Sequence, residues 1–380
     1  MDKKAGVTLQ FGPGGSGAGI GNFLEIGPLD VCLKPRNSTW LKKGDLLFVD
    51  NPVGTGYSYV EDTNLLVKTD DENAADITTL LIQVVNSQKS LQNRPLYIVG
   101  ESYGGKIAVT LALSALKAIK NGTLKLKLGG VALGNSWISP IDYVFSWGPL
   151  LSDVSRLDNN GLLESNSVAN QIKQQLDAGK FAEATGSVDK LQDVIIQTSN
   201  AVNMYNFLYD QSSHSSSSQS TSEFNSEKMR MKGYSRYLNS LATTSCDGDL
   251  DTVLNYLHTL MNGKIKQKLK IIPESLKWEL LANPVYEAMA GDFMKPRIEE
   301  VNQLLAQGVN VTIYNGQLDV ACATKGTEAW VQKLKWSGLN RFLLTKRNPF
   351  YCGVDPTSTA GFVKSYNNLK FYWILGAGHL

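Results

Sequence analysis

The segment Gly100-Glu101-Ser102-Tyr103-Gly104 constrains this chain more strongly than any other stretch of its sequence. It follows a short apolar run, 96–99, and precedes a segment rich in alanine and leucine, 103–120, so we predict a strand, a tight turn and a helix. Glycines two positions before and after a serine let strand and helix pack closely, and the serine Oγ then projects above the sheet. The pattern predicts that Ser102 is a nucleophile; the alternative is an ordinary glycine-rich turn.

The remaining periodicity predicts a sheet whose strands alternate with helices. Apolar runs bounded by turn residues predict buried strands at 46–50, 96–99, 130–135, 309–314 and 369–374. Apolar residues at helical spacing predict helices at 74–91 and 103–120. Strands that alternate with helices form mostly parallel sheets covered on both faces, so we expect an α/β fold with such a sheet at its centre.

A change of pattern after about residue 150 predicts an insertion in this fold. Helical periodicity dominates the segment 151–262, which also contains the serine-rich tract 212–222. That tract buries too little apolar surface to offset its conformational entropy, so we expect a disordered surface loop there. The interpretation is a helical cap at 151–262, inserted between a first part of the core, 1–150, and a second part, 263–380.

A nucleophilic serine needs a base, and the chain contains only 3 histidines. His214 lies in the serine-rich tract, and His258 lies in a helical stretch of the cap, where a place on the helix surface is expected. His379 follows the predicted strand 369–374 through a Gly-Ala-Gly loop. Catalytic side chains of α/β folds gather on loops at the carboxyl ends of strands, so we predict His379 as the base.

The third member of the site should be an acid between Ser102 and His379, since the α/β-hydrolase fold runs in the order serine, acid, histidine. Asp319 comes shortly after the predicted strand 309–314, whereas Asp247 and Asp292 follow no convincing strand. An acid at this position fixes the tautomer of the histidine and stabilises the imidazolium. We therefore predict an α/β-hydrolase fold with a helical cap and with Ser102, Asp319 and His379 as its triad.

An oxyanion hole would come from backbone N–H groups. One is expected from Tyr103, directly after the nucleophile, and a second from the glycine-rich loop 12–17. Neither GxxxxGK[ST] nor GxGxxG occurs, so this loop does not predict phosphate or dinucleotide binding, and we expect no cofactor.

Composition and short motifs narrow the partners. The net charge of +2 gives no reason to expect nucleic acid, and no apolar run is long enough to span a membrane. No apolar stretch follows Met1, so no signal peptide is expected. The 4 cysteines lack CxxC spacing, so structural zinc is not expected; they allow up to two disulfides in three pairings, or free thiols. Sequons at Asn37, Asn121 and Asn310 are glycosylation candidates that hint at a secretory-pathway protein.

Several motifs resemble those of the serine carboxypeptidase family. They are Gly100-Glu101-Ser102-Tyr103-Gly104-Gly105-Lys106, the segment 50–59 with Asp50-Asn51-Pro52 at its start, and Gly376-Ala377-Gly378-His379. The segments 22–28 and 134–140 resemble the branch that contains retinoid-inducible serine carboxypeptidase and plant serine carboxypeptidase-like proteins. The resemblance covers essentially the whole chain.

The resemblance implies an activity and roles for individual residues. Family members release single residues from peptide C-termini through an acyl-enzyme, without metal or cofactor, in the vacuole, in the lysosome or as secreted proteins. The triad would be Ser102, Asp319 and His379, with the amides of Gly12 and Tyr103 as oxyanion donors. Glu101 would recognise the substrate carboxylate, and Gln10 and Asn51 would also contact substrate. Two adjacent carboxyl groups share one proton at acidic pH and repel each other when both ionise.

The chain also departs from the family pattern. Phe11 stands where relatives have a glycine whose amide helps to hold the substrate carboxylate. Few residues precede the oxyanion loop, and the chain stops at Leu380, so it resembles a product truncated at both ends. We expect His379, so near a terminus, to fray. Two alternatives remain: an acyltransferase that uses the same triad, and a catalytically impaired protein with a binding role.

Overall fold

The computed structural model describes residues 4–9, 14–92, 94–210, 250–352 and 358–379. The serine-rich tract 212–222 with His214, the rival acid Asp247, and the loop residues Gln10, Phe11 and Gly12 lie outside the described residues.

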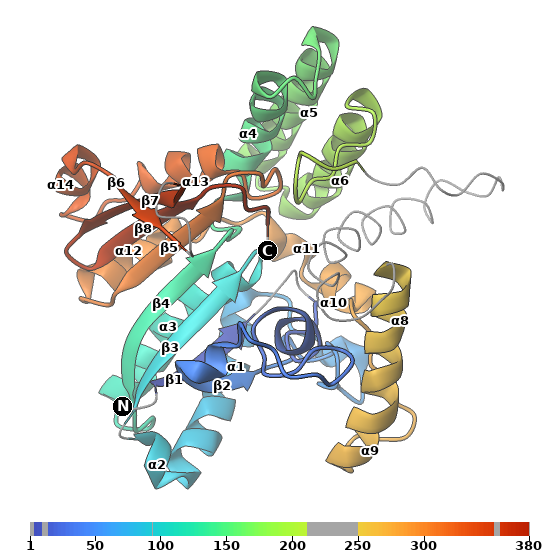
Figure 1. The fold of residues 1–380 in the computed structure, drawn as a ribbon, viewed down its shortest axis with the longest axis vertical. Coiled ribbons are helices and arrows are strands. Elements are labelled where there is room, and N and C mark those ends of the chain that lie inside the picture. The colour runs from blue at the N-terminus through green and yellow to red at the C-terminus, as the bar shows by residue number, and fades with distance from the viewer. Residues whose placement is uncertain (1–3, 10–13, 93, 211–249, 353–357, 380) are drawn as a thin grey trace.

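A central sheet of eight strands organises the described part of the chain (Figure 1). Its order is β2-β1-β3-β4-β5-β8-β7-β6. The strands are β1 (Lys4–Leu9), β2 (Gly44–Phe48), β3 (Pro95–Glu101), β4 (Lys127–Gly134), β5 (Val311–Gly316), β6 (Asn348–Tyr351), β7 (Thr359–Tyr366) and β8 (Leu369–Ile374). The strands from β2 to β8 in this order pair in parallel, and only β7 and β6 are antiparallel to their neighbours.

The parallel register brings the carboxyl ends of four strands to one edge. Glu101 at the end of β3 pairs with Gly134 of β4, and Gly134 pairs with Tyr314 of β5. Gly316 at the end of β5 pairs with Ile374 at the end of β8. Loops that leave these strands therefore start side by side, which is where α/β folds collect their functional side chains.

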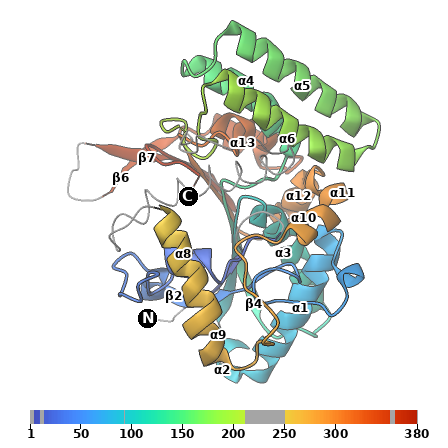
Figure 2. The same cartoon turned by 90° about the vertical axis from the view of Figure 1, so that its right-hand side faces the viewer.

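Helices surround this sheet. The helices that pack against its strands are α3 (Gly104–Lys120), α12 (Ile298–Ala306), α13 (Thr324–Val331) and α14 (Leu339–Leu344), and α1 (Asp70–Ser87) packs against α3. Between β4 and β5 the chain forms α4 (Pro140–Asp153), α5 (Asn159–Asp177), α6 (Phe181–Thr198), α8 (Leu250–Leu260), α9 (Lys266–Leu269), α10 (Asn283–Ala288) and α11 (Ala290–Phe293). The pair α5 and α6 projects from the body beyond α4, as both views show (Figures 1 and 2).

The fold class is as predicted, with a mostly parallel sheet surrounded by helices. The strand expected at 369–374 has those bounds, but the helix expected from residue 74 begins at Asp70. It starts earlier because Thr69 and Glu72 form a reciprocal capping box. The hairpin of β6 and β7 was not anticipated, since β6 is a mostly exposed edge strand that contains a proline.

Helix α3 forms the centre of the core. It packs against β3 and β4, and its inward face is made of small and aliphatic residues that are fully buried, among them Ile107, Ala108, Leu111, Ala112 and Ala115. Alanines at these positions allow helix and strand to approach closely. The N-terminus of α3 is thus fixed directly behind the end of β3.

The structure also bears on the cysteines and on membrane-spanning helices. Cys32 is in a disulfide, whereas Cys322 is a free buried thiol and Cys352 a free exposed one, so the four cysteines do not form two disulfides. Among the described helices, none combines the length and the apolar character needed to cross a membrane.

Candidate active site

Ser102 occupies a strained turn between β3 and α3, as its motif predicts. Its φ of 55° lies in the left-handed region, which residues with a Cβ rarely adopt outside special sites. The Ser102 N–H donates to the carbonyl oxygens of Gly134 and Asn135, both at 3.1 Å, and the Ser102 carbonyl accepts from Trp137 N–H at 2.8 Å. The loop after β4 therefore fixes the turn through backbone hydrogen bonds.

The flanking glycine has the role that the motif implies. A Cβ added at Gly100 would lie 2.2 Å from the Gly104 carbonyl oxygen and 2.8 Å from Ala108 Cβ. Such a contact is possible only if strand and helix move apart. Glycine at position 100 is thus required by the close approach of β3 and α3.

Asp319 and His379 form a buried hydrogen-bonded pair. Asp319 Oδ2 lies 2.8 Å from His379 Nδ1, and both side chains are fully buried. The other carboxylate oxygen, Oδ1, accepts from Cys322 N–H at 3.1 Å. On the far side of the ring, His379 Nε2 is buried and has no hydrogen-bond partner among the described residues. A histidine oriented by a carboxylate through Nδ1 leaves Nε2 available for a proton.

His379 is fixed firmly, and the expectation that it would fray is wrong. Its N–H donates to the Tyr205 carbonyl at 2.8 Å, and its ring lies 5.0 Å from the Tyr205 ring. Asn135 Nδ2 donates to the carbonyls of Gly378, at 2.9 Å, and of His379, at 2.8 Å. Asn135 Oδ1 accepts from Gly316 N–H at 2.9 Å, so one side chain joins the loops after β4, β5 and β8. Long-range hydrogen bonds hold the histidine despite its position near the chain end.

Cys322 links the acid, the base and the serine. One ligand-type atom each of Asp319, Cys322 and His379 lie within 4.8 Å of one another. Burial raises the pKa of the Cys322 thiol, nearby carboxylates raise it further, and a hydrogen bond with Ser102 opposes this. Ser102 is therefore adjacent to the group that contains Asp319 and His379. Sulfur, nitrogen and carboxylate oxygen can bind zinc, but here the carboxylate and the imidazole are already paired with each other.

A second carboxyl group lies near Glu101. Burial raises the pKa of Glu25 to about 8, although the charge of Arg36 opposes this. Burial also raises the pKa of Glu101 well above its ordinary value, and the charges of Glu25 and Asp319 raise it further. The pKa of Tyr314 is raised by burial and then by the same two glutamates. These carboxyls lie close together and favour protonated forms. Glu25 was not among the predicted site residues, although it lies within the family motif 22–28.

Asn51 and the described end of the glycine-rich loop are held by buried hydrogen bonds. Asn51 Nδ2 donates to the Val49 carbonyl at 3.1 Å, and Asn51 Oδ1 accepts from Asn73 at 3.3 Å. Asp50 Oδ1 accepts from Ser16 Oγ at 2.6 Å and from Ala18 N–H at 3.0 Å. The segment that begins Asp50-Asn51 therefore anchors the described end of the glycine-rich loop.

Tyr103 connects the nucleophile turn to buried charges. Its hydroxyl donates to Asp70 Oδ1 at 2.7 Å. Arg297 Nε donates to Asp70 Oδ2 at 2.9 Å, and Lys106 Nζ lies 3.4 Å from the same oxygen. Asp70 and Lys106 are fully buried, and Arg297 is nearly so. Such groups are stable in a protein interior only when paired and hydrogen-bonded.

Asp292 completes this buried network and is not the acid of the site. Arg297 Nη2 donates to Asp292 Oδ2 at 2.7 Å, and Lys106 Nζ donates to the carbonyls of Asp292, at 2.7 Å, and Phe293, at 3.0 Å. Burial alone would raise the pKa of Asp292, but the charges of Lys106 and Arg297 outweigh it and lower the pKa to about 2. The network joins α1, α3, α11 and α12 behind the nucleophile turn.

The remaining predicted residues lie on the surface. His258 is exposed on α8, where its Nε2 lies 3.1 Å from Asn262 Nδ2, so the prediction of a surface histidine is confirmed. The sequon residues Asn37, Asn121 and Asn310 are all exposed.

Comparisons with known proteins agree with this geometry. A family model described as serine carboxypeptidase matches residues 7–380. Serine carboxypeptidase-like 51 of Arabidopsis thaliana is 57% identical, over 98% of this chain and 80% of its own length. Retinoid-inducible serine carboxypeptidase of Mus musculus is 48% identical, also over 98% of this chain and 80% of its own length. A prohormone-processing carboxypeptidase from Saccharomyces cerevisiae has the same fold, with a TM-score of 0.80 at 21% identity over 100% of this chain and 79% of that chain.

Proposed function

The chain belongs to the serine carboxypeptidase family, and on that premise we propose that Ser102, Asp319 and His379 are the triad with which it releases C-terminal residues from peptides. The buried hydrogen bond between Asp319 and His379 carries this proposal, since it leaves Nε2 of an oriented imidazole free to take a proton. Cys322, which contacts this pair, also hydrogen-bonds with Ser102. No other described histidine has such a partner, because His258 is exposed and pairs with an asparagine.

The proposed reaction follows from these groups. Ser102 Oγ attacks the carbonyl carbon of the last peptide bond while His379 Nε2 takes the serine proton. The oxyanion accepts hydrogen bonds from the N–H groups of Tyr103 and Gly12. His379 then gives its proton to the leaving amine, and the C-terminal amino acid departs. Water, deprotonated by His379, attacks the acyl-enzyme, and the imidazolium returns its proton to Ser102 Oγ as the peptide departs; Asp319 stabilises the imidazolium in both steps.

Recognition of the substrate carboxylate is assigned to Glu101, together with Gln10 and Asn51. The raised pKa values of Glu101 and Glu25 keep at least one of these carboxyls protonated at acidic pH. A protonated carboxyl donates a hydrogen bond to a carboxylate, whereas an ionised one repels it. We therefore expect binding of a free C-terminus to weaken as the pH rises toward 8.

A labelling and cleavage assay tests the proposal. A fluorophosphonate probe is expected to modify Ser102, and the protein is expected to release the C-terminal residue of a blocked dipeptide. Ser102→Ala should abolish both, whereas Ser87→Ala, an exposed serine of α1, should change neither. Turnover of an acyl-glucose with an alcohol instead of the dipeptide would assign the triad to acyl transfer. Folded protein that is not labelled would leave only a binding role.

We also propose that the protein works in the secretory pathway, as a secreted, vacuolar or lysosomal enzyme. Two observations support this: Cys32 is in a disulfide, and the asparagines of all three sequons are exposed. The division into a core of 1–150 and 263–380 with a cap of 151–262 is likewise a proposal. It is supported by α5 and α6, which come between β4 and β5 in the chain and project from the body (Figure 2). Peptide C-termini are the proposed partners, with no nucleic acid, membrane, metal or cofactor.

A further inference from the structure

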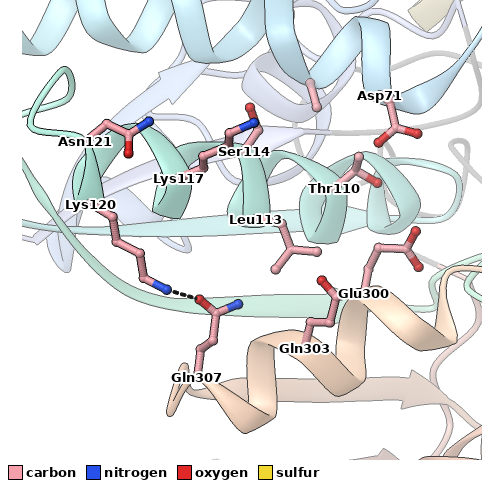
Figure 3. A pocket seen from close by; sticks show the side chains of 11 residues that line it. Asp71, Thr110, Leu113, Ser114, Lys117, Lys120, Asn121, Glu300, Gln303 and Gln307 are labelled. Carbon is pink, nitrogen blue, oxygen red and sulfur yellow. Dashed lines mark hydrogen bonds between the residues drawn. The ribbon is translucent and has the colours of Figure 1, made fainter.

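A groove of about 580 Å³ lies along α3, between α1 and α12 (Figure 3). No residue of the proposed triad lines it, so it is separate from the candidate active site. Its size is in the range of sites for small ligands. It is lined by Leu113, Lys117 and Lys120 of α3 with its C-cap Asn121, and by Gln303 of α12 with its C-cap Gln307. The groove is thus large enough to hold a ligand that the proposed reaction does not require.

One end of the groove carries a sequon. Asn121, the first residue of Asn121-Gly122-Thr123, caps the C-terminus of α3 and lines the groove. Nothing in the structure lies within 4 Å of the place where a Cβ at Gly122 would project, so the space beside the asparagine is open. A sugar joined to Asn121 Nδ2 would start at the groove itself.

The attachment point is held rigidly. Asn121 N–H donates to the Lys117 carbonyl at 3.0 Å, and Thr123 N–H donates to the Ala118 carbonyl at 3.0 Å. Asn86 Nδ2, from α1, donates to the Thr123 carbonyl at 2.7 Å. A rigid anchor reduces the conformational entropy that a tethered group loses when it settles on a neighbouring surface.

The chemistry of the Asn121 end of the groove suits a neutral sugar, while the carboxylates of Asp71 and Glu300 line the opposite end (Figure 3). Gln303 and Gln307 supply amides that donate and accept hydrogen bonds, and Lys117 and Lys120 supply donors. Leu113 adds an apolar contact for the face of a sugar ring. Lys120 Nζ donates to Gln307 Oε1 at 2.7 Å, which places the amide of the α12 C-cap opposite the end of α3 that carries Asn121 (Figure 3).

We propose that the first N-acetylhexosamine residues of an N-linked glycan on Asn121 lie in this groove and bridge α3 and α12. The proposal rests on the proposed passage through the secretory pathway. Because the glycan is covalently tethered, its contacts form within one molecule, and weak hydrogen bonds are then sufficient to keep it in place. A glycan in this position would also stabilise the packing of α12 on α3, two helices that already touch.

The other two sequons provide matched controls within the same chain. Asn37 is exposed in the loop before β2, and Asn310 is exposed directly before β5, where its Nδ2 lies 3.3 Å from the Gly129 carbonyl. Neither residue lines the groove. Glycans at Asn37 and Asn310 should therefore extend into solvent.

The test uses the full chain produced in a eukaryotic secretory host. Mass spectrometry of glycopeptides measures occupancy at each sequon, and a time course with an endoglycosidase on the native protein measures the rate of release. We expect the Asn121 glycan to be released about tenfold more slowly than the Asn37 glycan. This is the ratio expected if the glycan bound in the groove is favoured about tenfold over the glycan free in solvent. After denaturation the two rates should become equal.

A double variant, Gln303→Ala with Gln307→Ala, separates the groove from the sequon. It should raise the release rate at Asn121 toward that at Asn37, leave the rate at Asn37 unchanged and retain cleavage of the blocked dipeptide. An unmodified Asn121 would refute glycosylation there, and with it the groove proposal. An occupied Asn121 whose glycan is released as fast as that on Asn37 would overturn the groove proposal alone.

Discussion

The two sides of the candidate active site are held in different ways. On the nucleophile side, a local turn with a required glycine fixes Ser102, and a buried network of charges lies behind Tyr103. On the histidine side, a few hydrogen bonds from distant parts of the chain fix His379, above all those from Asp319 and Asn135. The charged network behind Tyr103 is thus remote from the reaction, whereas the side-chain anchors of the histidine touch the reacting group itself. Mutations on the two sides should have different consequences.

The largest expected effect comes from the acid. Asp319→Asn keeps the size of the side chain but favours the wrong tautomer of His379, so kcat should fall by about 10⁴-fold. The free energy of unfolding should change far less than the activity, because Oδ1 can still accept from Cys322 N–H. Kinetics with a blocked dipeptide and a denaturant titration measure both quantities. A variant that keeps more than about a tenth of the wild-type kcat would show that Asp319 does not orient the base.

The next largest effect is expected at Asn135. Asn135→Ala removes the donor that holds the carbonyls of Gly378 and His379 and the acceptor for Gly316 N–H. A small displacement of the imidazole should lower kcat by about 100-fold, with a smaller change in KM. Asn86→Ala, at an exposed backbone contact of α1, is the control and should leave kcat unchanged. Equal kinetics for both variants would show that the histidine does not depend on this anchor.

A mutation in the buried charge network should lower stability strongly and kcat only slightly, the opposite of the mutations beside His379. Arg297→Ala leaves Asp70 and Asp292 without their main partner, so the free energy of unfolding should fall by about 3–5 kcal/mol. The kcat of the protein that remains folded should stay within about fivefold of wild type, less than one tenth of the Asn135 effect. Denaturant titration combined with active-site labelling gives both values. The matched control is Arg341→Ala on the exposed surface of α14. A larger loss of kcat in Arg297→Ala than in Asn135→Ala would contradict the proposed difference between the nucleophile side and the histidine side.

Tyr103→Phe tests the contact between the network and the turn with a single atom. It deletes the hydroxyl that donates to Asp70 and keeps the ring, which stacks on Phe293 at a centroid distance of 5.5 Å. We expect a loss of stability of about 1.5–3 kcal/mol, as for a hydrogen bond to a charged group, and little change in kcat, since the Tyr103 N–H is retained. A strong loss of kcat at unchanged stability would mean that the hydroxyl itself takes part in catalysis.

The smallest expected effect concerns pH. The pKa of Glu25 rises from 4.5 to about 8 in the folded protein, so folding favours its protonated form. Its contribution to stability is therefore complete below pH 4.5 and is lost as the pH rises through about 8. Glu25→Gln should flatten the decline of the unfolding midpoint over this range, whereas Glu279→Gln, an exposed residue, should not. An unchanged pH profile in Glu25→Gln would show that this carboxyl is not protonated by folding.

The same contrast explains what could be predicted from the sequence. The turn at Ser102 is a local arrangement, so its glycines and its flanking strand and helix identify it. Asp319 and His379 could be predicted because few histidines exist and because both follow predicted strands. Their hydrogen bond agrees with that prediction, while their catalytic role is still a proposal.

What the sequence does not contain is the partner of each buried group. Asn135, Glu25 and Cys322 meet the predicted residues only through contacts between segments far apart in the chain. For the same reason the fraying expected for His379 was wrong, since its position near the end is visible in the sequence and its anchors are not. The local signals were the spacing of Cys322, three positions after Asp319, and the motifs 22–28 and 134–140, which contain Glu25 and Asn135.

The central claim is that Ser102 and His379 act as one unit, and a double-mutant cycle tests it most directly. The variants are Ser102→Ala, His379→Ala and the combination of both, with kcat measured on a blocked dipeptide and folding checked by denaturant titration. If the two residues form one triad, each single variant should lose about 10⁶-fold in kcat, and the double variant should lose no more than either. Losses that multiply in the double variant, or a His379→Ala variant within about tenfold of wild type, would contradict the proposed site.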